Sequence, residues 1–334
     1  MKILEKENCC GCGACQNICP KNAISMVLEN DGFRYPHIDE EKCINCGLCK
    51  NVCPVLNLKK EDENLPDTYA CYNKNEKIRM ESSSGGMFSL IAEEVLNQNG
   101  VIFGAAFDEN LEVKHIKIEI KEDLRLLRGS KYLQSDTDKT FREAKEFLEK
   151  GKKVFYTGTP CQIEGLKSFL RKDYENLLCG DLICHGVPSK NIFDKYIKNI
   201  GEKIKKVYFR DKENKGWNNY QVLIQTENKK IYEDHEKDEF MNEFLSDRYL
   251  RESCYNCKFK KKHRISDFTF ADFWGINNIA PEMNDEKGTS LLFVNSNKGK
   301  EIFEKLKPFI VYKKVDFYQA IKYNPSMIKS SQKN

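Results

Sequence analysis

The clearest pattern of hydrophobic and polar positions begins near residue 68, where short apolar runs alternate with stretches of helical periodicity. Residues 101–107 form an apolar run typical of a buried strand, and residues 114–120 alternate strictly, as a half-exposed strand does. Further strands are expected at 68–72, 154–157, 177–184, 207–210, 221–226 and 291–295, and helices at 87–98, 137–150, 161–171 and 189–200. This alternation predicts an α/β domain with a mixed, mainly parallel sheet.

The first 57 residues follow a different pattern, a repeat of cysteines spaced C-x2-C-x2-C-x3-C-P. Its two halves are Cys9, Cys12, Cys15, Cys19 and Cys43, Cys46, Cys49, Cys53, displaced by 34 positions. Between them, residues 23–27 and 35–38 are short enough to form a small β-ribbon. We therefore predict an α+β module at 1–57, a charged linker at 58–67 and a larger domain at 68–325, divided near residue 150.

The spacing of this repeat is that of bacterial two-cluster ferredoxins. Three thiolates on one tight loop can hold three corners of a [4Fe-4S] cubane, while the next turn carries the fourth Cys to the other cluster. The first cluster is therefore assigned to Cys9, Cys12, Cys15 and Cys53, and the second to Cys43, Cys46, Cys49 and Cys19. Zinc sites use paired C-x2-C units and rarely this run. Cys10 lies outside the pattern and is expected to be a spare residue.

Composition limits what else the chain can be. Its net charge of +4 gives no argument for nucleic acid, and the basic run at 258–264 is of the kind that usually forms a solvated face. No stretch is long and apolar enough for a membrane span, and residues 1–7 lack the apolar region of a signal peptide. We expect a cytoplasmic protein, in which fifteen cysteines indicate metal ligands or catalytic thiols. The polar tail at 330–334 is expected to fray.

Two glycine-containing motifs could bind an anionic group. The first opens the helix expected at 87–98, where free N–H groups could seat a phosphate; its residues are Ser83, Ser84, Gly85 and Gly86. An ordinary serine N-cap explains it equally well. The second is a basic loop with an aromatic ring, which could clamp a phosphate or be a helix C-cap. Its residues are Arg128, Gly129, Ser130, Lys131 and Tyr132.

Two further motifs follow expected strands, where open α/β sheets bind ligands. They are Gly158-Thr159-Pro160-Cys161 and Cys184-His185-Gly186. A lone C-x2-C pair, Cys254 and Cys257, cannot fill the coordination shell of a metal by itself. Cys161 and Cys184 could complete it, which would give a third [4Fe-4S] cluster. A zinc site and buried thiols remain alternatives.

Taken together, these motifs resemble the beta subunits of coenzyme F-420 hydrogenases and dehydrogenases, in the form fused to a ferredoxin domain. The resemblance rests on the order and spacing of motifs at 83–86, 127–132, 158–162, 181–189, 209–212, 216–217, 253–259 and 272–275. It implies an iron–sulfur flavoprotein oxidoreductase with FAD in the larger domain. The FAD is expected at Ser83 to Gly86, Arg128 to Tyr132, Gly158 and Thr159. Lys131 could stabilise the negative charge of a reduced flavin. His185 could deliver a proton or be a structural histidine.

The resemblance also implies partners. Electrons would pass between a redox protein, such as a ferredoxin or a hydrogenase or dehydrogenase subunit, and a small two-electron substrate. Some bacterial relatives accompany enzymes of surface-polysaccharide synthesis. Two alternatives remain open: a flavin-free electron-relay subunit, and a thiol enzyme that uses Cys161 with His185.

Overall fold

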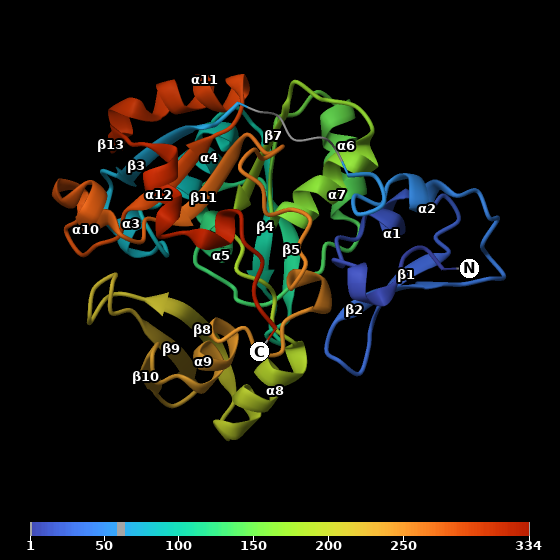
Figure 1. Cartoon of the computed structure of the whole chain (residues 1–334), viewed down its shortest axis with the longest axis horizontal. Coiled ribbons are helices and arrows are strands. Elements are labelled where there is room, and N and C mark those ends of the chain that lie inside the picture. The colour runs from blue at the N-terminus through green and yellow to red at the C-terminus, as the bar shows by residue number, and fades with distance from the viewer. Residues whose placement is uncertain (1, 59–63, 334) are drawn as a thin grey trace.

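Residues 2–58 and 64–333, which the computed structural model describes, place eight strands in one central sheet (Figure 1). The strand order is β13-β3-β12-β11-β7-β6-β4-β5. In chain order the strands are β3 (Asp67–Asn73), β4 (Val101–Phe107), β5 (Val113–Ile118), β6 (Val154–Thr157), β7 (Leu177–Leu182), β11 (Phe268–Asp272), β12 (Ser290–Val294) and β13 (Ile310–Lys314).

The middle of this sheet is parallel and its edges are antiparallel. Strands β11, β7, β6 and β4 run in one direction, with Val154 of β6 opposite Val101 and Leu177 on its neighbours. β5, β12, β3 and β13 pair antiparallel. The predicted α/β fold with a mixed sheet is confirmed. Because β6 and β7 are parallel neighbours, the segments that follow them emerge at the same edge.

Successive residues of a strand point to opposite faces, so each face of the sheet has its own core. Ile102 and Phe155 pack with α4 (Met87–Leu96), α5 (Leu124–Leu127) and α11 (Asn297–Leu306). Phe103 and Tyr156 pack on the other face. That face is covered by α6 (Thr140–Glu149) and α7 (Pro160–Leu170), and further along by α10 (Ile276–Ile279) and α12 (Phe317–Lys322).

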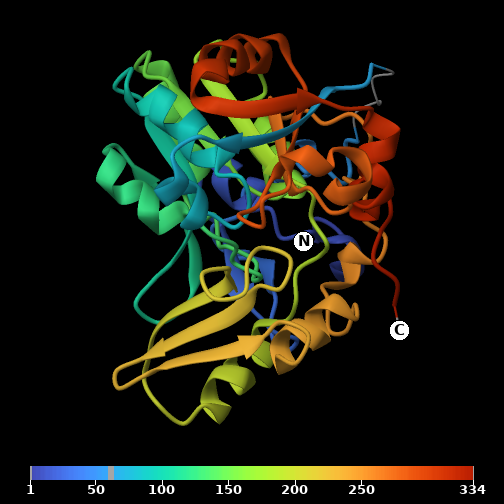
Figure 2. The ribbon, with the colours of Figure 1, turned by 90° about the vertical axis from the view of Figure 1, so that its left-hand side faces the viewer.

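A second, antiparallel sheet lies apart from the central one, as the yellow strands of Figure 2 show. It consists of β8 (Ile204–Asp211), β9 (Gln221–Thr226) and β10 (Lys230–Asp234). The strands expected at 207–210 and 221–226 therefore exist, but not in the central sheet. α8 (Lys190–Asn199) and α9 (Glu239–Leu245) share its apolar core. One more short helix, α3 (Glu76–Met80), follows β3 of the central sheet.

The N-terminal module is a β-ribbon flanked by two short helices. Its elements are α1 (Ala14–Ile18), β1 (Ile24–Leu28), β2 (Arg34–Ile38) and α2 (Leu48–Asn51). β1 and β2 pair antiparallel, as the sequence predicts. Figure 1 places the module beside α6 and α7. Cys10, Cys12, Ala14 and Val52 share a buried cluster with the core beneath these helices, so the module is packed firmly on the larger domain.

Short 3-10 helices complete the chain: Lys6–Asn8 (η1), Lys121–Asp123 (η2), Glu252–Cys254 (η3), Pro281–Met283 (η4), Lys307–Phe309 (η5) and Pro325–Met327 (η6). Of the linker expected at 58–67, residues 59–63 lie outside the described residues. Across the described part of the chain, no helix is both long and apolar enough to cross a bilayer.

Two expectations about surfaces were wrong. The basic run at 258–264 is not a solvated face throughout, because Arg264 is 4% exposed and donates to the carbonyls of Phe259 and Met327. The described part of the tail at 330–334 does not fray. Ser330 Oγ accepts from the Cys257 N–H at 3.0 Å, and the Gln332 N–H donates to Asp247 at 2.7 Å. Both segments make tertiary hydrogen bonds that composition cannot reveal.

Candidate metal centres and the adjoining polar face

The first half of the cysteine repeat surrounds one hollow in the module. Its lining contains the predicted first set, Cys9, Cys12, Cys15 and Cys53, and neither a carboxylate nor a histidine. Gly13 opens α1 with a φ of 80°, and a Cβ there would lie 2.2 Å from Thr137 Oγ1. Glycine is therefore required both for the backbone conformation and for the packing of the module on the larger domain.

The second half surrounds another hollow at the outer end of the module. The predicted second set, Cys19, Cys43, Cys46 and Cys49, lines it, again without a carboxylate or histidine. Cys19 comes from the first half of the repeat because α1 carries the chain away from the first loop. Cys46 is exposed and its neighbour Ile44 is 57% exposed. All-thiol linings suit iron–sulfur clusters, which are held by four Cys thiolates.

A third thiol-lined hollow lies where the module meets the larger domain, because Asn8, Cys10 and Val55 of the module also line it. Cys161, Cys184, Cys254 and Cys257, the residues predicted for a third cluster, all line it. Cys161 is in the first turn of α7, which follows β6, and Cys184 follows β7. The parallel pairing of β6 and β7 thus brings these two thiols to one edge, and the segment at the end of η3 adds the other two. Thr159 also lines this hollow.

The donor set of the third hollow fits a cluster better than a single ion. Among the described residues, no three His, Cys, Asp or Glu side chains converge closely enough to hold one metal ion. A zinc site would require such convergence, whereas a cubane separates its ligands. Burial raises the pKa of Cys254 to about 12. Thiolates in this hollow therefore need a positive group to compensate them, which a metal cluster supplies.

Sequence reasoning missed the position of Cys10. Its side chain is buried and lines both the first and the third hollow. The Cys10 thiol interacts with the thiols of Cys12 and Cys161. The adjacency to a ligand was visible in the sequence, but the approach of α7 was not. Cys10 thus marks the place where the two hollows adjoin.

Glycine in α7 allows this close approach. Gly165 lies one helical turn after Cys161, so both face the module. A Cβ on Gly165 would be 2.9 Å from Cys12 Sγ and 3.0 Å from Cys12 Cβ. The helix can therefore rest directly against the first cysteine loop.

His185 lies beside the third hollow and is tied into the chain. Its Nε2 is 2.7 Å from Asp247 Oδ1 and 3.2 Å from the Phe244 carbonyl oxygen. Its own carbonyl accepts from Lys260 Nζ and from Ser331 Oγ. Burial lowers the pKa of His185, which favours the neutral imidazole. These contacts agree with a structural histidine, and its role in proton delivery stays a prediction.

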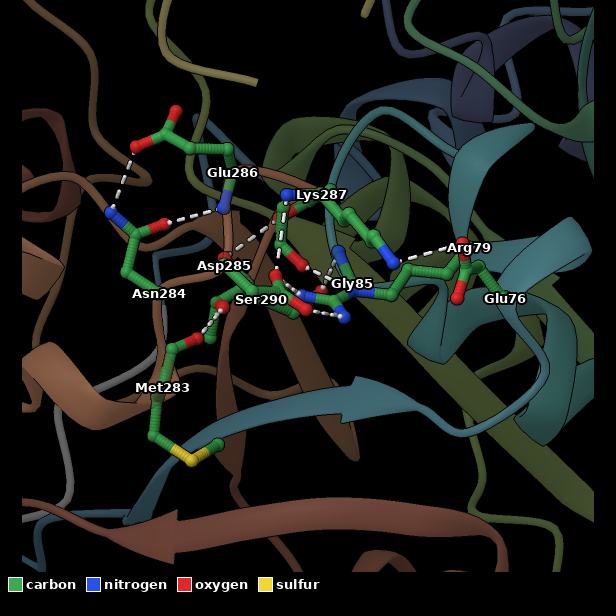
Figure 3. A network of polar contacts seen from close by, with 12 residues as sticks. Glu76, Arg79, Gly85, Met283, Asn284, Asp285, Glu286, Lys287 and Ser290 are labelled. Atoms are coloured by element: carbon green, nitrogen blue, oxygen red, sulfur yellow. Dashed lines mark hydrogen bonds and ion pairs between the residues drawn. The ribbon is translucent and has the colours of Figure 1, made fainter. Parts of the chain in front are cut away.

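The motif that opens α4 is held by the loop from Met283 to Ser290 (Figure 3). The Gly85 N–H donates to Ser290 Oγ at 2.9 Å, and Ser84 Oγ donates to the Thr289 carbonyl at 2.8 Å. Arg79 reaches the same loop, with its Nε on the Gly288 carbonyl and its Nη atoms on Asp285. The donors expected to bind phosphate at Ser84 and Gly85 are thus engaged within the chain.

The basic loop of Arg128 to Tyr132 meets this motif. Ser83 Oγ accepts from the Ser130 N–H at 2.8 Å and lies 2.9 Å from Ser130 Oγ. Lys131 Nζ donates to the carbonyls of Leu126, Leu127, Arg128 and Gly129 at the end of α5, as a helix C-cap does. Burial lowers the pKa of Lys131 to about 7. Nothing lies within 4 Å of a Cβ built on Gly129, so that side of the loop is open.

A cationic and aromatic cluster continues this face. Arg210 is paired with both Asp272 oxygens at 3.1 Å and lies 4.9 Å from the ring centre of Trp274. Trp217 stacks on Trp274 and donates to Asp272. Lys212, 3% exposed, donates to the carbonyls of Ser84 and Lys287. Three motifs to which the sequence assigned no role, 209–212, 216–217 and 272–275, therefore converge beside Ser83 to Gly86.

The residues predicted for a flavin thus fall into two places. Ser83 to Gly86 contact Arg128 to Tyr132 through Ser130 and contact Lys212 through Ser84, and Arg210 lies against Trp274. Cations beside an aromatic ring suit an anionic aromatic group. Thr159 belongs to the wall of the third hollow, where its Oγ1 lies 3.1 Å from Cys161 Sγ. Gly158 precedes it and lies against Gln162 and His115 instead.

Comparisons with known proteins agree with this division of the chain. Residues 8–57 match the model of the 4Fe-4S dicluster domain, and residues 151–316 match that of the C terminus of the coenzyme F420 hydrogenase/dehydrogenase beta subunit. The fold is similar to a chain in a xenon-derivatised F420-reducing [NiFe] hydrogenase complex from Methanosarcina barkeri. That match has 16% identity and a TM-score of 0.53, and covers 80% of this chain and 93% of the other. No curated protein matches the sequence.

Proposed function

Because residues 8–57 match the 4Fe-4S dicluster domain and residues 151–316 match the C terminus of the coenzyme F420 hydrogenase/dehydrogenase beta subunit, we propose that this iron–sulfur redox protein is a flavin-dependent oxidoreductase. It would pass electrons between a one-electron carrier, two [4Fe-4S] clusters in the module, a third cluster in the larger domain, FAD and a two-electron substrate. The resemblance does not identify that substrate; we propose a link to surface-polysaccharide metabolism because some bacterial relatives accompany enzymes of surface-polysaccharide synthesis.

The observation that carries this proposal is the succession of thiol-lined hollows. The outer hollow reaches the surface at Cys46, the first adjoins the third through Cys10, and the third lies where the module meets the larger domain. An exposed edge suits docking of a redox protein, such as a ferredoxin or part of a hydrogenase. A buried end suits transfer to a second cofactor, because exclusion of water protects reactive groups.

The chain itself supplies binding, orientation and exclusion of water. When bound, clusters carry single electrons and a flavin exchanges one or two, which would connect the carrier to the substrate. The third cluster would be held by Cys161, Cys184, Cys254 and Cys257. Ser330 of the tail accepts a hydrogen bond from the Cys257 N–H. Neutral His185 could accept a proton at the imidazole nitrogen that does not face Asp247.

For the flavin, we propose the face formed by Arg128, Ser130, Tyr132, Lys212 and Trp274. Lys212 Nζ is buried and donates to two carbonyls, burial lowers the pKa of Lys212 to about 7, and a bound anion would favour its charged form. Arg210 Nε lacks a partner within the described residues. A negative group at this face would be stabilised by both cations. Gly129 leaves the approach open on the side of the loop.

The test is a titration of the anaerobically purified protein with FAD, followed by addition of dithionite. The proposal predicts binding of FAD near one equivalent and bleaching of its absorbance after the clusters are reduced. The variant Trp274→Ala should weaken FAD binding without changing the iron content. Lys314→Ala is the matched control. It removes an exposed lysine of the edge strand β13 that is paired with Asp67.

Intact clusters with no FAD binding would contradict the flavoenzyme. The chain would then be the electron-relay subunit that the sequence leaves as an alternative.

A further inference from the structure

Arg251 is a fully buried guanidinium without an acidic partner. It is 1% exposed and donates to three neutral acceptors: the Cys9 carbonyl at 2.6 Å, Gln134 Oε1 at 3.0 Å and the Arg34 carbonyl at 3.0 Å. Within the described residues, no carboxylate lies at ion-pair distance from it. The other buried arginines, Arg79, Arg210 and Arg264, have Asp285, Asp272 and Asp181 beside them.

Such a charge is costly unless something compensates it. A buried ion without a counter-charge destabilises a protein by several kcal/mol, and carbonyl hydrogen bonds offset only part of this cost. The rings of Tyr35 and Phe33, 4.3 and 5.4 Å from the guanidinium, contribute a cation–π attraction, but neither ring carries a negative charge. A negative group close to Arg251 is therefore needed.

The position of Arg251 indicates which groups these are. On one side it holds the loop of the first hollow: it binds the carbonyl of Cys9, and a Cβ on Gly11 would lie 2.9 Å from its Nη1. On the other side it begins the loop of the third hollow, because its carbonyl accepts from the Cys254 N–H at 2.8 Å. Ser253 of that loop donates to the Cys9 carbonyl as well.

Arg251 thus lies at the junction of two thiol sets. Four thiolates around a [4Fe-4S] core leave a net negative charge, and reduction adds one electron without making or breaking a bond or moving a proton. A fixed positive charge nearby favours the more negative, reduced state. The guanidinium is suited to this place because it stays protonated and is weakly hydrated.

We propose that Arg251 is the shared counter-charge of the cluster held by Cys9, Cys12, Cys15 and Cys53 and of the third cluster, and that it raises the reduction potential of both. The first half concerns a cluster of the dicluster domain and stands alone. The second half rests on the third cluster of the proposed function.

The test is an anaerobic redox titration of the holoprotein followed by electron paramagnetic resonance. In Arg251→Gln, the midpoint potentials of the first and third clusters should shift to more negative values. The outer cluster, whose ligands include exposed Cys46, is the internal reference and should shift less. Arg251→Lys keeps the charge and should restore most of the potential.

A second variant neutralises Arg251 without removing it. Gln134→Glu would place a carboxylate where the amide oxygen now accepts from Nη1 at 3.0 Å. The same negative shift is expected, and it can be measured even if Arg251→Gln does not fold. The matched control is Arg142→Gln. Arg142 also donates to a module carbonyl, that of Cys19, but is only partly buried and so is screened by water. It should leave the first cluster unchanged.

Three results would each overturn the inference. They are unchanged potentials in Gln134→Glu, equal shifts of all clusters, and failure of Arg251→Lys to restore the potential. Iron per chain, measured on the same samples, separates the two proposals: about eight irons instead of about twelve would remove the third cluster. A shift confined to the first cluster at that content would still support the role of Arg251 there.

Discussion

The outer hollow around Cys46 and the third hollow around Cys254 are each lined by four predicted cluster ligands, but they are built differently. Three of the outer ligands fall within seven residues of sequence, whereas the third hollow draws on three segments between residues 161 and 257. The outer one reaches solvent at Cys46, whereas at the third the Cys257 N–H is held by Ser330 of the tail. One is formed by a local loop and the other by the fold of the whole domain.

This difference teaches how much each site depends on its surroundings. A loop that carries its own ligands can bind metal once it closes. The third hollow exists only when β6, β7 and the segment at the end of η3 are in place. Damage to the larger domain should therefore affect the third hollow first and leave the module intact.

The largest expected effect comes from the double variant Cys254→Ser, Cys257→Ser. It should lose about four irons per chain, because serine is a poor ligand for a cluster and two ligands are missing. The module should keep its own iron. The measurement is iron and acid-labile sulfide per chain. The control is Cys71→Ala, which removes a buried thiol outside all three hollows. Full iron content in the double variant would rule out the third cluster.

Acid should weaken the larger domain through His115. Burial lowers the pKa of His115 to about 4, so between about pH 6.5 and 4 the unfolded chain binds a proton that the folded chain does not. Stability is therefore present above pH 6.5 and falls as the pH is lowered, by up to about 3 kcal/mol.

Urea unfolding at pH 7 and 5 tests this, with His115→Gln as the comparison. Asp181, whose pKa burial raises to about 6, acts in the opposite direction, so only the difference between the two proteins is informative. An equal loss of stability in both would show that His115 is not responsible.

A larger side chain in α7 should separate the module from the domain. In Gly165→Leu, the added atoms would meet Cys12, and overpacking of this kind costs about 1 to 3 kcal/mol. We expect earlier proteolysis between the two parts and a lower unfolding midpoint. Lys167→Leu, on the opposite side of the helix, should change neither. A midpoint equal to that of the wild type in Gly165→Leu would contradict the close contact.

The smallest effect is expected from removing residues 330–334. The truncation would remove the hydrogen bond that Ser330 accepts and the two that Ser331 and Gln332 donate. Each contributes about 1 kcal/mol to stability. The third hollow should then lose iron faster in air, while the outer one releases iron at its former rate. Lys333→Ala, which breaks an exposed ion pair with Glu252 and a cation–π contact with Tyr255 but leaves the tail in place, is the control. Equal rates in the truncated and full-length proteins would show that the tail protects nothing.

The sequence predicted the parts of the molecule that depend on short-range patterns. The strand at 101–107, the helix at 161–171 and both quartets of the repeat follow from periodicity or spacing that spans few residues. The third set of cysteines was also named, because an unpaired C-x2-C demands partners and two other cysteines follow expected strands.

What the sequence did not predict depends on contacts between distant segments. Arg251 looked like an ordinary charged residue, and Cys10 like a spare thiol, until the module was packed on α7. Strands β11 and β13 were not predicted; β11 pairs with β7 and β12, and β13 pairs with β3, far back along the chain. Lys260 belongs to a basic run, yet it turns inward to the His185 carbonyl.

The most direct test of the account is the iron, acid-labile sulfide and flavin content of the wild-type protein after anaerobic purification. Three [4Fe-4S] clusters and one flavin site predict about twelve irons and about one FAD per chain. About eight irons with no flavin, even after incubation with FAD, would leave an electron-relay protein with two clusters and contradict both the third cluster and the flavoenzyme.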